Sequence, residues 1–153
     1  LSIAIPCYNS EKYMRKCIES LLVGGEDVEI LVVDDGSTKD KTAEIADEYA
    51  AQYPTIVKAI HKENGGPSVA RDYGIEHSGD TKYVFFLDCD DLIDKTMLEC
   101  LYWTLETHPE ASFAYTSMVN FGDREFIWEQ WLTIEREMIE NSKRGLIYLD
   151  MNG

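Results

Sequence analysis

The chain has 153 residues, 44% hydrophobic and 28% charged, which is enough for one ordinary globular core and short for two. Lys and Arg number 14 against 29 Asp and Glu, and this net charge of −15 argues against binding to a nucleic-acid backbone, which attracts mainly cationic side chains. The apolar runs are shorter than the roughly 20 residues of a membrane-spanning helix. We therefore expect one domain without a transmembrane segment.

Residues 1–54 predict two successive strand–helix steps. Residues 2–6 form an apolar run typical of a buried strand, and residues 28–33 form a second. Helical spacing after the first run places these side chains on one apolar stripe: Tyr13, Met14, Cys17, Ile18, Leu21 and Leu22. After the second run, one helical face is expected to hold Ala46, Tyr49, Ala50 and Tyr53, and Pro54 is expected to end that helix.

Residues 56–119 continue the alternation. Strands are predicted at 56–60, 83–87 and 111–119. A tight loop at 64–66 leads into a short helix with Pro67 in its first turn. A further helix is expected to have Asp94 as its N-cap. Its core-facing side chains are expected to be Leu98, Leu101 and Leu105.

Strands that are continuously apolar and alternate with helices predict an α/β fold with a mostly parallel sheet and helices on both faces. Beyond residue 121 the pattern is weaker, with one amphipathic helix that ends near Gly145 and a short strand at 146–149. The apolar side chains of that helix are Trp128, Trp131, Leu132, Met138 and Ile139. The two tryptophans are more typical of core packing than of stacking on an acceptor sugar.

Ligands of open α/β sheets bind beyond the carboxyl ends of the strands, and here those ends are rich in polar groups. The fourth predicted strand ends in 88–91, Asp-Cys-Asp-Asp. Carboxylates crowded at a strand end repel one another unless a cation lies between them, and Mg²⁺ or Mn²⁺ suits such oxygen ligands. The alternative is that these acids only cap the following helix.

Asp34 and Asp35 end the second predicted strand, where Asp-Gly-Ser is also ordinary turn chemistry. An ionised Asp here would accept a ring N–H from a pyrimidine base, with Tyr8 stacked beside it. Arg71 lies in the short helix after the glycine loop and is suited to bidentate contact with the base or the diphosphate, and Lys62 adds a second positive charge. The alternative for both basic residues is a solvated ion pair with the abundant acids. The three histidines (His61, His77 and His108) lack ligand-like spacing and predict surface or loop positions.

Four segments together resemble the nucleotide-binding half of glycosyltransferase family 2, of the GT-A fold. They are residues 6–11 (PCYNSE), 30–37 (ILVVDDGS), 64–75 (NGGPSVARDYGI) and 86–91 (FLDCDD), the last of which resembles the family's Asp-X-Asp segment. In the third, Asp72 stands where Asn is more usual. The resemblance covers roughly residues 1 to 120, so we expect a nucleotide-sugar-binding core at 1–120 and an incomplete acceptor-side segment of the same domain at 121–153.

The resemblance implies a metal-assisted, inverting transfer of a hexose from a UDP-linked sugar to a saccharide or lipid-linked acceptor. It implies that Asp35 binds the base, that Asp88 holds the ribose, and that Asp90 coordinates Mn²⁺ or Mg²⁺ bridging the donor diphosphate. The same resemblance assigns the rest of the nucleotide pocket to Pro6, Tyr8, Glu11 and Arg71. It further implies polysaccharide assembly in the cytoplasm, at the inner face of a membrane with which the protein associates peripherally. The four widely spaced cysteines fit a reduced, cytoplasmic protein.

The general base that would activate the acceptor has no recognisable motif between residues 121 and 153. The available carboxylates there are Glu129, Glu135, Glu137 and Asp150. The alternative function is therefore a catalytically incomplete nucleotide-sugar-binding module. A dehydrogenase is disfavoured because no Gly-X-Gly-X-X-Gly follows the first strand. An Asp-X-Asp phosphatase is disfavoured because its nucleophile follows the first strand, whereas this triplet follows the fourth.

Overall fold

A computed structural model describes residues 1–22, 28–94, 96–116 and 148–149 of the chain. The chain divides into two compact units, Leu1–Lys95 and Thr96–Gly153. This boundary does not coincide with the predicted division at residue 120, which stays a prediction. No helix among the described residues is long and apolar enough to cross a membrane.

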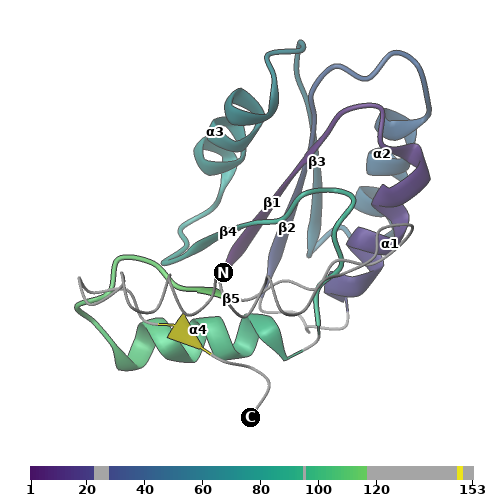
Figure 1. The fold of residues 1–153 in the computed structure, drawn as a ribbon. Helices are drawn as coiled ribbons and strands as arrows, with labels where there is room; N and C mark the ends of the chain where they lie inside the picture. The colour runs from purple at the N-terminus through teal and green to yellow at the C-terminus, as the bar shows by residue number, and fades with distance from the viewer. Residues whose placement is uncertain (23–27, 95, 117–147, 150–153) are drawn as a thin grey trace, which may run out of the picture. The chain divides into compact units, whose positions relative to one another are not determined.

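The first unit is built on a four-stranded parallel sheet in the order β3-β2-β1-β4 (Figure 1). Its strands are β1 (Ser2–Cys7), β2 (Glu29–Asp34), β3 (Val57–His61) and β4 (Val84–Phe86). The two central strands carry the core, with these side chains fully buried: Ile3, Ala4, Ile5, Ile30, Leu31, Val32 and Val33. Consecutive buried residues mean that both faces of the sheet are covered, as their continuous apolar runs predict.

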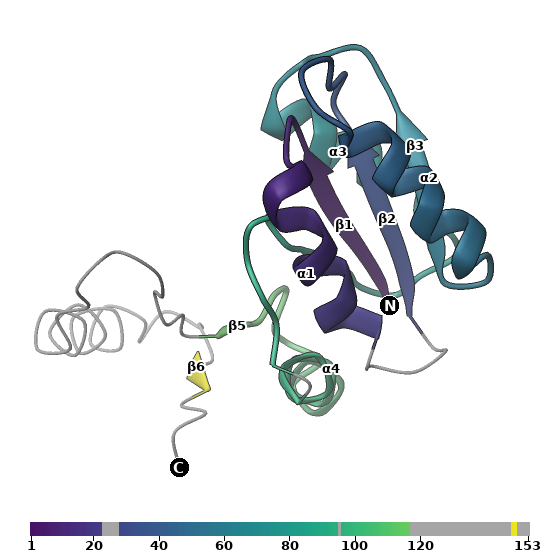
Figure 2. The same ribbon diagram turned by 90° about the vertical axis from the view of Figure 1, so that its right-hand side faces the viewer.

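Helices cover both faces of this sheet. α1 (Glu11–Leu22) and α2 (Thr42–Gln52) lie on one face, and α3 (Pro67–His77) lies on the other (Figures 1 and 2). The α/β prediction, with a parallel sheet between helices, is therefore confirmed. α3 lies close to the sheet because it has no side chain at Gly74, where a Cβ atom would come within 2.6 Å of the Cβ of Ala4.

Two helical faces differ in detail from the expected ones. α1 buries Met14, Cys17, Ile18 and Leu21. Tyr13 is 48% exposed and Leu22 is half-buried, so the buried stripe is narrower than predicted. α2 buries Thr42, Ile45, Ala46 and Tyr49, whereas Ala50 and Tyr53 are half-buried. The buried face of α2 is therefore displaced about one turn toward the start of the helix, where Thr42 is tied to the strand ends.

The second unit contains α4 (Met97–Thr107), whose N-cap is Thr96. The prediction that Asp94 is the N-cap is wrong. Ile93 is buried and its N–H binds the Ser20 hydroxyl at 3.3 Å, which holds this stretch of chain outside a helix, so the helix starts later. Of the three leucines expected to face the core, only Leu101 is fully buried, and the other two are half-buried.

Beyond α4, β5 (Tyr115–Thr116) pairs in parallel with β6 (Tyr148–Leu149). β6 coincides with the end of the strand predicted at 146–149. The strand predicted at 111–119 is too long at its start, because the Ala111 N–H binds the His108 carbonyl at 2.9 Å in a turn that follows the helix. The predicted helix with Trp128 and Trp131, and Gly145 near its end, lie outside the described residues.

Candidate functional site

A cavity of about 600 Å³ lies in the first unit, at the carboxyl end of the parallel sheet. It is lined by the ends of β1 and β2, by the glycine loop and first turn of α3, and by the acidic segment that follows β4. Six of the seven predicted site residues line it: Pro6, Tyr8, Asp35, Arg71, Asp88 and Asp90. Tertiary structure therefore brings together side chains that are separated by up to 84 positions in the sequence.

Glu11 is the predicted site residue that the structure does not bring to the cavity. It begins α1, and its carboxylate accepts the Lys41 N–H at 3.1 Å. Its own N–H donates to the Asp40 carboxylate at 2.9 Å. These contacts tie the start of α1 to the loop before α2, which is a structural task.

Asp35 lies at the cavity wall with only 3% of its surface exposed. Its Oδ1 accepts hydrogen bonds from Lys62 Nζ at 2.5 Å and from the Gly65 N–H at 2.9 Å, and its Oδ2 accepts the Gly66 N–H at 2.7 Å. Burial alone would raise the pKa of this carboxyl, but Lys62 and the two amides lower it below its ordinary value. Asp35 is therefore an ionised acceptor held from several directions.

Gly36 allows the turn after β2 to lie against the glycine loop. Its φ is +71°, and a Cβ atom there would come within 2.8 Å of the Asn64 backbone nitrogen. Asn64 in turn donates from its side-chain amide to the Asp35 carbonyl at 3.0 Å. Because only glycine fits this contact without strain, Gly36 fixes the wall that carries Asp35.

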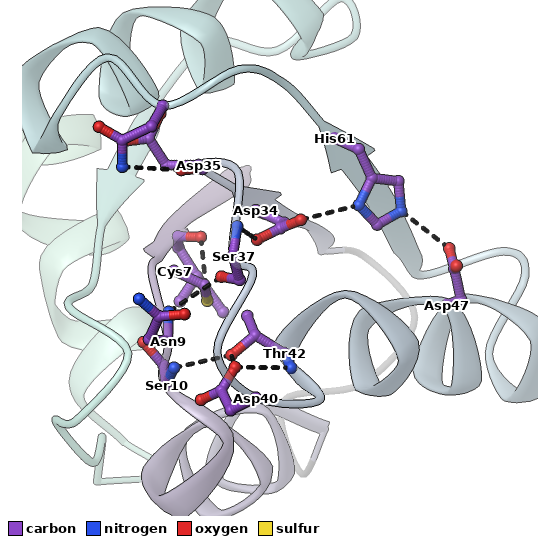
Figure 3. Close-up of polar contacts among 12 residues, drawn as sticks. Cys7, Asn9, Ser10, Asp34, Asp35, Ser37, Asp40, Thr42, Asp47 and His61 are labelled. Atoms are coloured by element: carbon purple, nitrogen blue, oxygen red, sulfur yellow. Dashed lines mark hydrogen bonds and ion pairs between the residues drawn. The ribbon is translucent and has the colours of Figure 1, made fainter.

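Asp34 has a different environment from its neighbour, as Figure 3 shows. It is buried, and its carboxylate accepts the Ser37 N–H at 3.0 Å and lies 3.2 Å from His61 Nδ1. Ser37 accepts the Asn9 N–H at 2.9 Å, so the turns after β1 and β2 are joined. Of the two acids considered for base recognition, Asp34 organises the turns and Asp35 lines the cavity.

His61 differs from the expectation of an uninvolved surface residue. The end of β3 places its ring between two carboxylates, with Nδ1 3.2 Å from Asp34 and Nε2 3.0 Å from Asp47 on α2 (Figure 3). The hydrogen bond to Asp47, and then that to Asp34, raise the His61 pKa above its ordinary value of 6.5, against the opposing effect of partial burial. Spacing in the sequence carries no signal for this contact, which crosses from strand to helix.

Arg71 and Asp88 both line the cavity and contact each other there, with Nη2 of Arg71 2.5 Å from Oδ1 of Asp88. Both side chains keep substantial contact with solvent, at 35% and 53% exposure. The family resemblance predicts nucleotide contacts for both residues. Each neutralises the charge of the other, so a ligand that binds either one must replace this ion pair with contacts of its own.

The acidic segment after β4 forms a turn in which the Asp91 N–H binds the Asp88 carbonyl at 3.0 Å. Partial burial, and then the charges of Asp90 and Asp88, raise the pKa of the Asp91 carboxyl. Within residues 1–22, 28–94 and 96–116, no group of three or more His, Cys, Asp or Glu side chains is arranged to hold a metal ion by itself. The crowded carboxylates and the exposed Asp90 fit a hard cation that takes most of its ligands from elsewhere.

The sequence analysis assigned no role to several other side chains that line the cavity, among them Cys7, Ser10 and Cys89. Hydrogen bonding from Cys7, opposed by burial and assisted by Ser10, lowers the pKa of the Cys89 thiol to about 7. The Cys7 and Cys89 positions lie inside two of the motifs quoted above. No spacing rule identifies them, because they meet only when β1 and the segment after β4 lie side by side.

The family model described as "Glycosyl transferase family 2" matches residues 2–151. The chain belongs to glycosyltransferase family 2. The predicted family resemblance is therefore confirmed, and the match extends beyond residues 1 to 120, which the resemblance was expected to cover.

Relatives of this glycosyltransferase family 2 chain include two bacterial proteins. It is 40% identical over 106 residues to the minor teichoic acid biosynthesis protein GgaA of Bacillus subtilis, and the aligned region covers 66% of this chain and 24% of GgaA. It is 46% identical over 102 residues to the uncharacterized glycosyltransferase YibD of Escherichia coli, and the aligned region covers 66% of this chain and 29% of YibD. The chain thus spans less than a third of the length of these curated relatives.

Solved structures give the fold type. TarS 1–349 of S. aureus in complex with UDP-GlcNAc superimposes with a TM-score of 0.70 at 28% identity, covering 82% of this chain and 36% of that one. The complex of the same TarS fragment with UDP gives a TM-score of 0.69 at 27% identity, with coverage of 82% and 37%. The fold of this family 2 chain is accordingly the α/β GT-A fold.

Proposed function

We propose that this chain is the donor-binding part of a glycosyltransferase that transfers a hexose from a UDP-linked sugar to a saccharide or lipid-linked acceptor. The observation that carries the proposal is the cavity at the carboxyl end of the sheet, which gathers Asp35, Arg71, Asp88 and Asp90 from three separate family motifs. UDP and UDP-GlcNAc in the TarS structures support a nucleotide-sugar donor of this class.

Base recognition is assigned to Asp35 and Tyr8. An ionised carboxylate offers about four lone-pair positions, and Asp35 uses three of them for Lys62, Gly65 and Gly66. The remaining position, on Oδ2, is available for the ring N–H of uracil. Tyr8 is 49% exposed at the cavity wall, so its ring is accessible for stacking on the base.

The ribose and diphosphate of the donor are assigned to the part of the cavity lined by Asp88 and Arg71. Asp88 would accept hydrogen bonds from the ribose hydroxyls, and the Arg71 guanidinium would bind phosphate oxygens through two parallel N–H donors. Both residues must first leave each other, because they form an ion pair at 2.5 Å. Their exposure to solvent makes this exchange inexpensive, since exposed ion pairs contribute only about 0–1 kcal/mol.

Asp90 is assigned as the protein ligand of a divalent cation, Mn²⁺ or Mg²⁺. A cation bound there would supply Lewis-acid neutralisation of the negative charge on the departing diphosphate. The chain's own contribution is an exposed carboxylate at the cavity wall, beside the crowded Asp88 and Asp91. Pro6 closes the pocket next to Tyr8 at the end of β1.

The acceptor side completes the proposal. We infer an inverting reaction in which a carboxylate removes the acceptor hydroxyl proton, at the inner face of a membrane in the assembly of a polysaccharide. The candidate bases (Glu129, Glu135, Glu137 and Asp150) lie outside the described residues, and none is assigned. A second candidate function is a binding module that holds the donor without turnover, since no general base is assigned.

Calorimetry of the chain with UDP tests the proposal, with and without Mn²⁺ and with GDP as the competing nucleotide. We expect UDP to bind at least about tenfold more tightly than GDP, because guanine is a two-ring purine and is larger than the pyrimidine for which the pocket is proposed. Mn²⁺ should strengthen UDP binding, and Asp90→Ala should abolish this metal dependence while circular dichroism shows an unchanged fold. Asp94→Ala, an acid outside the cavity lining, is the matched control and should keep the dependence on Mn²⁺.

Failure of wild-type UDP binding in both conditions would contradict the proposed function. Retention of full metal dependence by Asp90→Ala would remove that residue from the metal site. To separate transferase from binding module, hydrolysis and transfer of UDP-GlcNAc are measured after the chain is extended with the downstream region of a family relative. Restored transfer supports the enzyme, and binding without turnover in the extended chain supports the module.

A further inference from the structure

Lys62 is a buried lysine whose ammonium group lies just behind the cavity wall. Its side chain is only 7% exposed. Nζ donates to Asp35 Oδ1 at 2.5 Å and to the Glu63 carbonyl at 2.5 Å, and it lies 5.7 Å from the centroid of the Tyr73 ring. An ammonium group buried to this degree is costly unless it is paired, and each of these partners offsets part of that cost.

The backbone of Lys62 is fixed as firmly as its ammonium. Its N–H binds the Asp34 carbonyl at 3.1 Å, which continues the pairing of β2 with β3 by one residue. Its carbonyl lies close to Gly36, where a Cβ atom would come within 3.1 Å of it. Lys62 is thus anchored between the turn that carries Asp35 and the loop that carries Gly65 and Gly66.

The contacts of Lys62, Gly65 and Gly66 restrict the rotation of the Asp35 carboxylate. Lys62 and Gly65 both bind Oδ1, and Gly66 binds Oδ2, so the carboxylate plane is held by donors on both oxygens. Without the ammonium, the two glycine amides would be the remaining donors to that side chain. They belong to a loop that packs against Lys62, since a Cβ on Gly65 would lie 3.0 Å from Nζ.

We propose that Lys62 is a positioning residue that locks the Asp35 carboxylate and the glycine loop, so that the donor pocket accepts bases that present a ring N–H and discriminates against cytosine. This inference rests on the proposed function, in which Asp35 contacts the base. Uracil presents an N–H at its N3 position, whereas cytosine presents a lone pair there. A fixed, acceptor-only carboxylate repels that lone pair. A carboxylate that is free to rotate can turn away from it, so the preference for uracil over cytosine is weakened.

UMP and CMP without metal are the probes, because both lack the diphosphate to which the cation is assigned. We expect the wild-type chain to bind UMP at least about tenfold more tightly than CMP, and Lys62→Met to reduce this ratio to about threefold or less. Lys62→Met keeps the length of the side chain and removes its charge. The matched control is Lys58→Met in β3, the strand that ends just before Lys62. Lys58 pairs with Glu29 and lies outside the cavity lining, so this variant should keep the wild-type ratio.

A second measurement does not depend on any nucleotide. Carbon-13 NMR titration of the Asp35 carboxyl should show its pKa rise in Lys62→Met, because the ammonium contributes to lowering it in the wild type. Unfolding would also return this pKa toward its ordinary value, so circular dichroism of the variant must show that it stays folded. If Lys62→Met does not fold, Lys62→Gln, which keeps a donor but no charge, carries both measurements.

The outcomes separate the two proposals. Wild-type protein that binds neither UMP nor UDP contradicts the proposed function. Wild-type discrimination that persists unchanged in a folded Lys62 variant overturns the positioning role alone, as does an Asp35 carboxyl titration that is the same in both proteins. Reduced discrimination together with a raised Asp35 pKa supports it.

Discussion

Asp34 and Asp35 are adjacent in sequence yet point to different surroundings, because successive residues at the end of a strand project to opposite sides. Asp34 organises the turn at Ser37 and contacts His61. Asp35 contacts Lys62 and the glycine-loop amides at the cavity. The Asp-Asp pair therefore combines a structural acid with one available to a ligand, and substitutions at the two positions should have different consequences.

Arg71→Ala tests the assignment of the ion pair at the cavity. Because Arg71 and Asp88 are 35% and 53% exposed, the loss of their pair should change the free energy of unfolding by less than about 1 kcal/mol. UDP binding should weaken about tenfold through loss of a charge-assisted contact to phosphate, whereas uridine binding should stay within about twofold. Calorimetry and urea denaturation measure the two effects.

Arg15→Ala is the control for that experiment. Arg15 forms an ion pair with Glu48 at 2.6 Å, with 44% and 53% exposure, and neither residue lines the cavity. It should therefore alter stability as little as Arg71→Ala and leave UDP affinity unchanged. Equal weakening of UDP and uridine by Arg71→Ala would place the effect at the base and contradict the phosphate assignment.

The carboxyl ends of β1, β2 and β3 are held together by side-chain contacts as well as by the backbone pairing of the sheet. Asn9 contacts Ser37, and Ser10 donates its N–H to Thr42 on α2 at 2.7 Å. His61 joins the end of β3 to Asp34 and to Asp47 on α2 (Figure 3). These contacts hold the turns that line the cavity, so their strength sets how well the site is preorganised.

The His61 bridge predicts a pH dependence of stability. An imidazolium has two N–H donors for the two carboxylates and a neutral ring has one, which agrees with a His61 pKa raised above 6.5 by Asp47 and Asp34. The folded-state pKa exceeds the unfolded value, so the stabilisation is complete below about pH 6.5 and is lost as pH rises through the folded-state pKa. With His61 43% exposed, its contribution should be at most about 1 kcal/mol.

Urea denaturation between pH 5.5 and 8.5 measures this effect as the difference between wild type and His61→Gln. The difference should shrink as pH rises, and Asp47→Asn should remove most of its pH dependence, because Asp47 is the main cause of the raised pKa. Parallel stability curves for wild type and His61→Gln would show that the bridge makes no contribution to stability through protonation.

Among the residues that the structure describes, all those that line the cavity belong to the unit Leu1–Lys95. That unit has its own parallel sheet, helices on both faces and a continuous buried core. We therefore expect a chain of residues 1–95 to unfold cooperatively and to bind UDP within about fivefold of the 153-residue chain. Circular dichroism in urea and calorimetry test this expectation, and a non-cooperative transition would show that the second unit is needed for the fold.

The alternation of strands and helices, the parallel sheet and the motifs that line the cavity could all be predicted from the sequence. Buried strands are continuously apolar and their ends carry polar residues, and both are local patterns. The same local rules misplaced the start of α4, because the Ile93–Ser20 contact that delays it joins residues far apart in the chain.

The partners of the charged side chains could be identified only from the tertiary structure. The sequence left Lys62 and Arg71 open between ligand contact and solvated ion pairs. The fold buries Lys62 against Asp35 and leaves Arg71 paired with Asp88 in contact with solvent. It also turns Glu11 away from the cavity and places His61 between two acids. The physical reason is that electrostatic partners are set by distance and burial in three dimensions. Parallel strands bring together residues that are far apart in the chain, and the spacing of residues along one strand does not predict which of them meet.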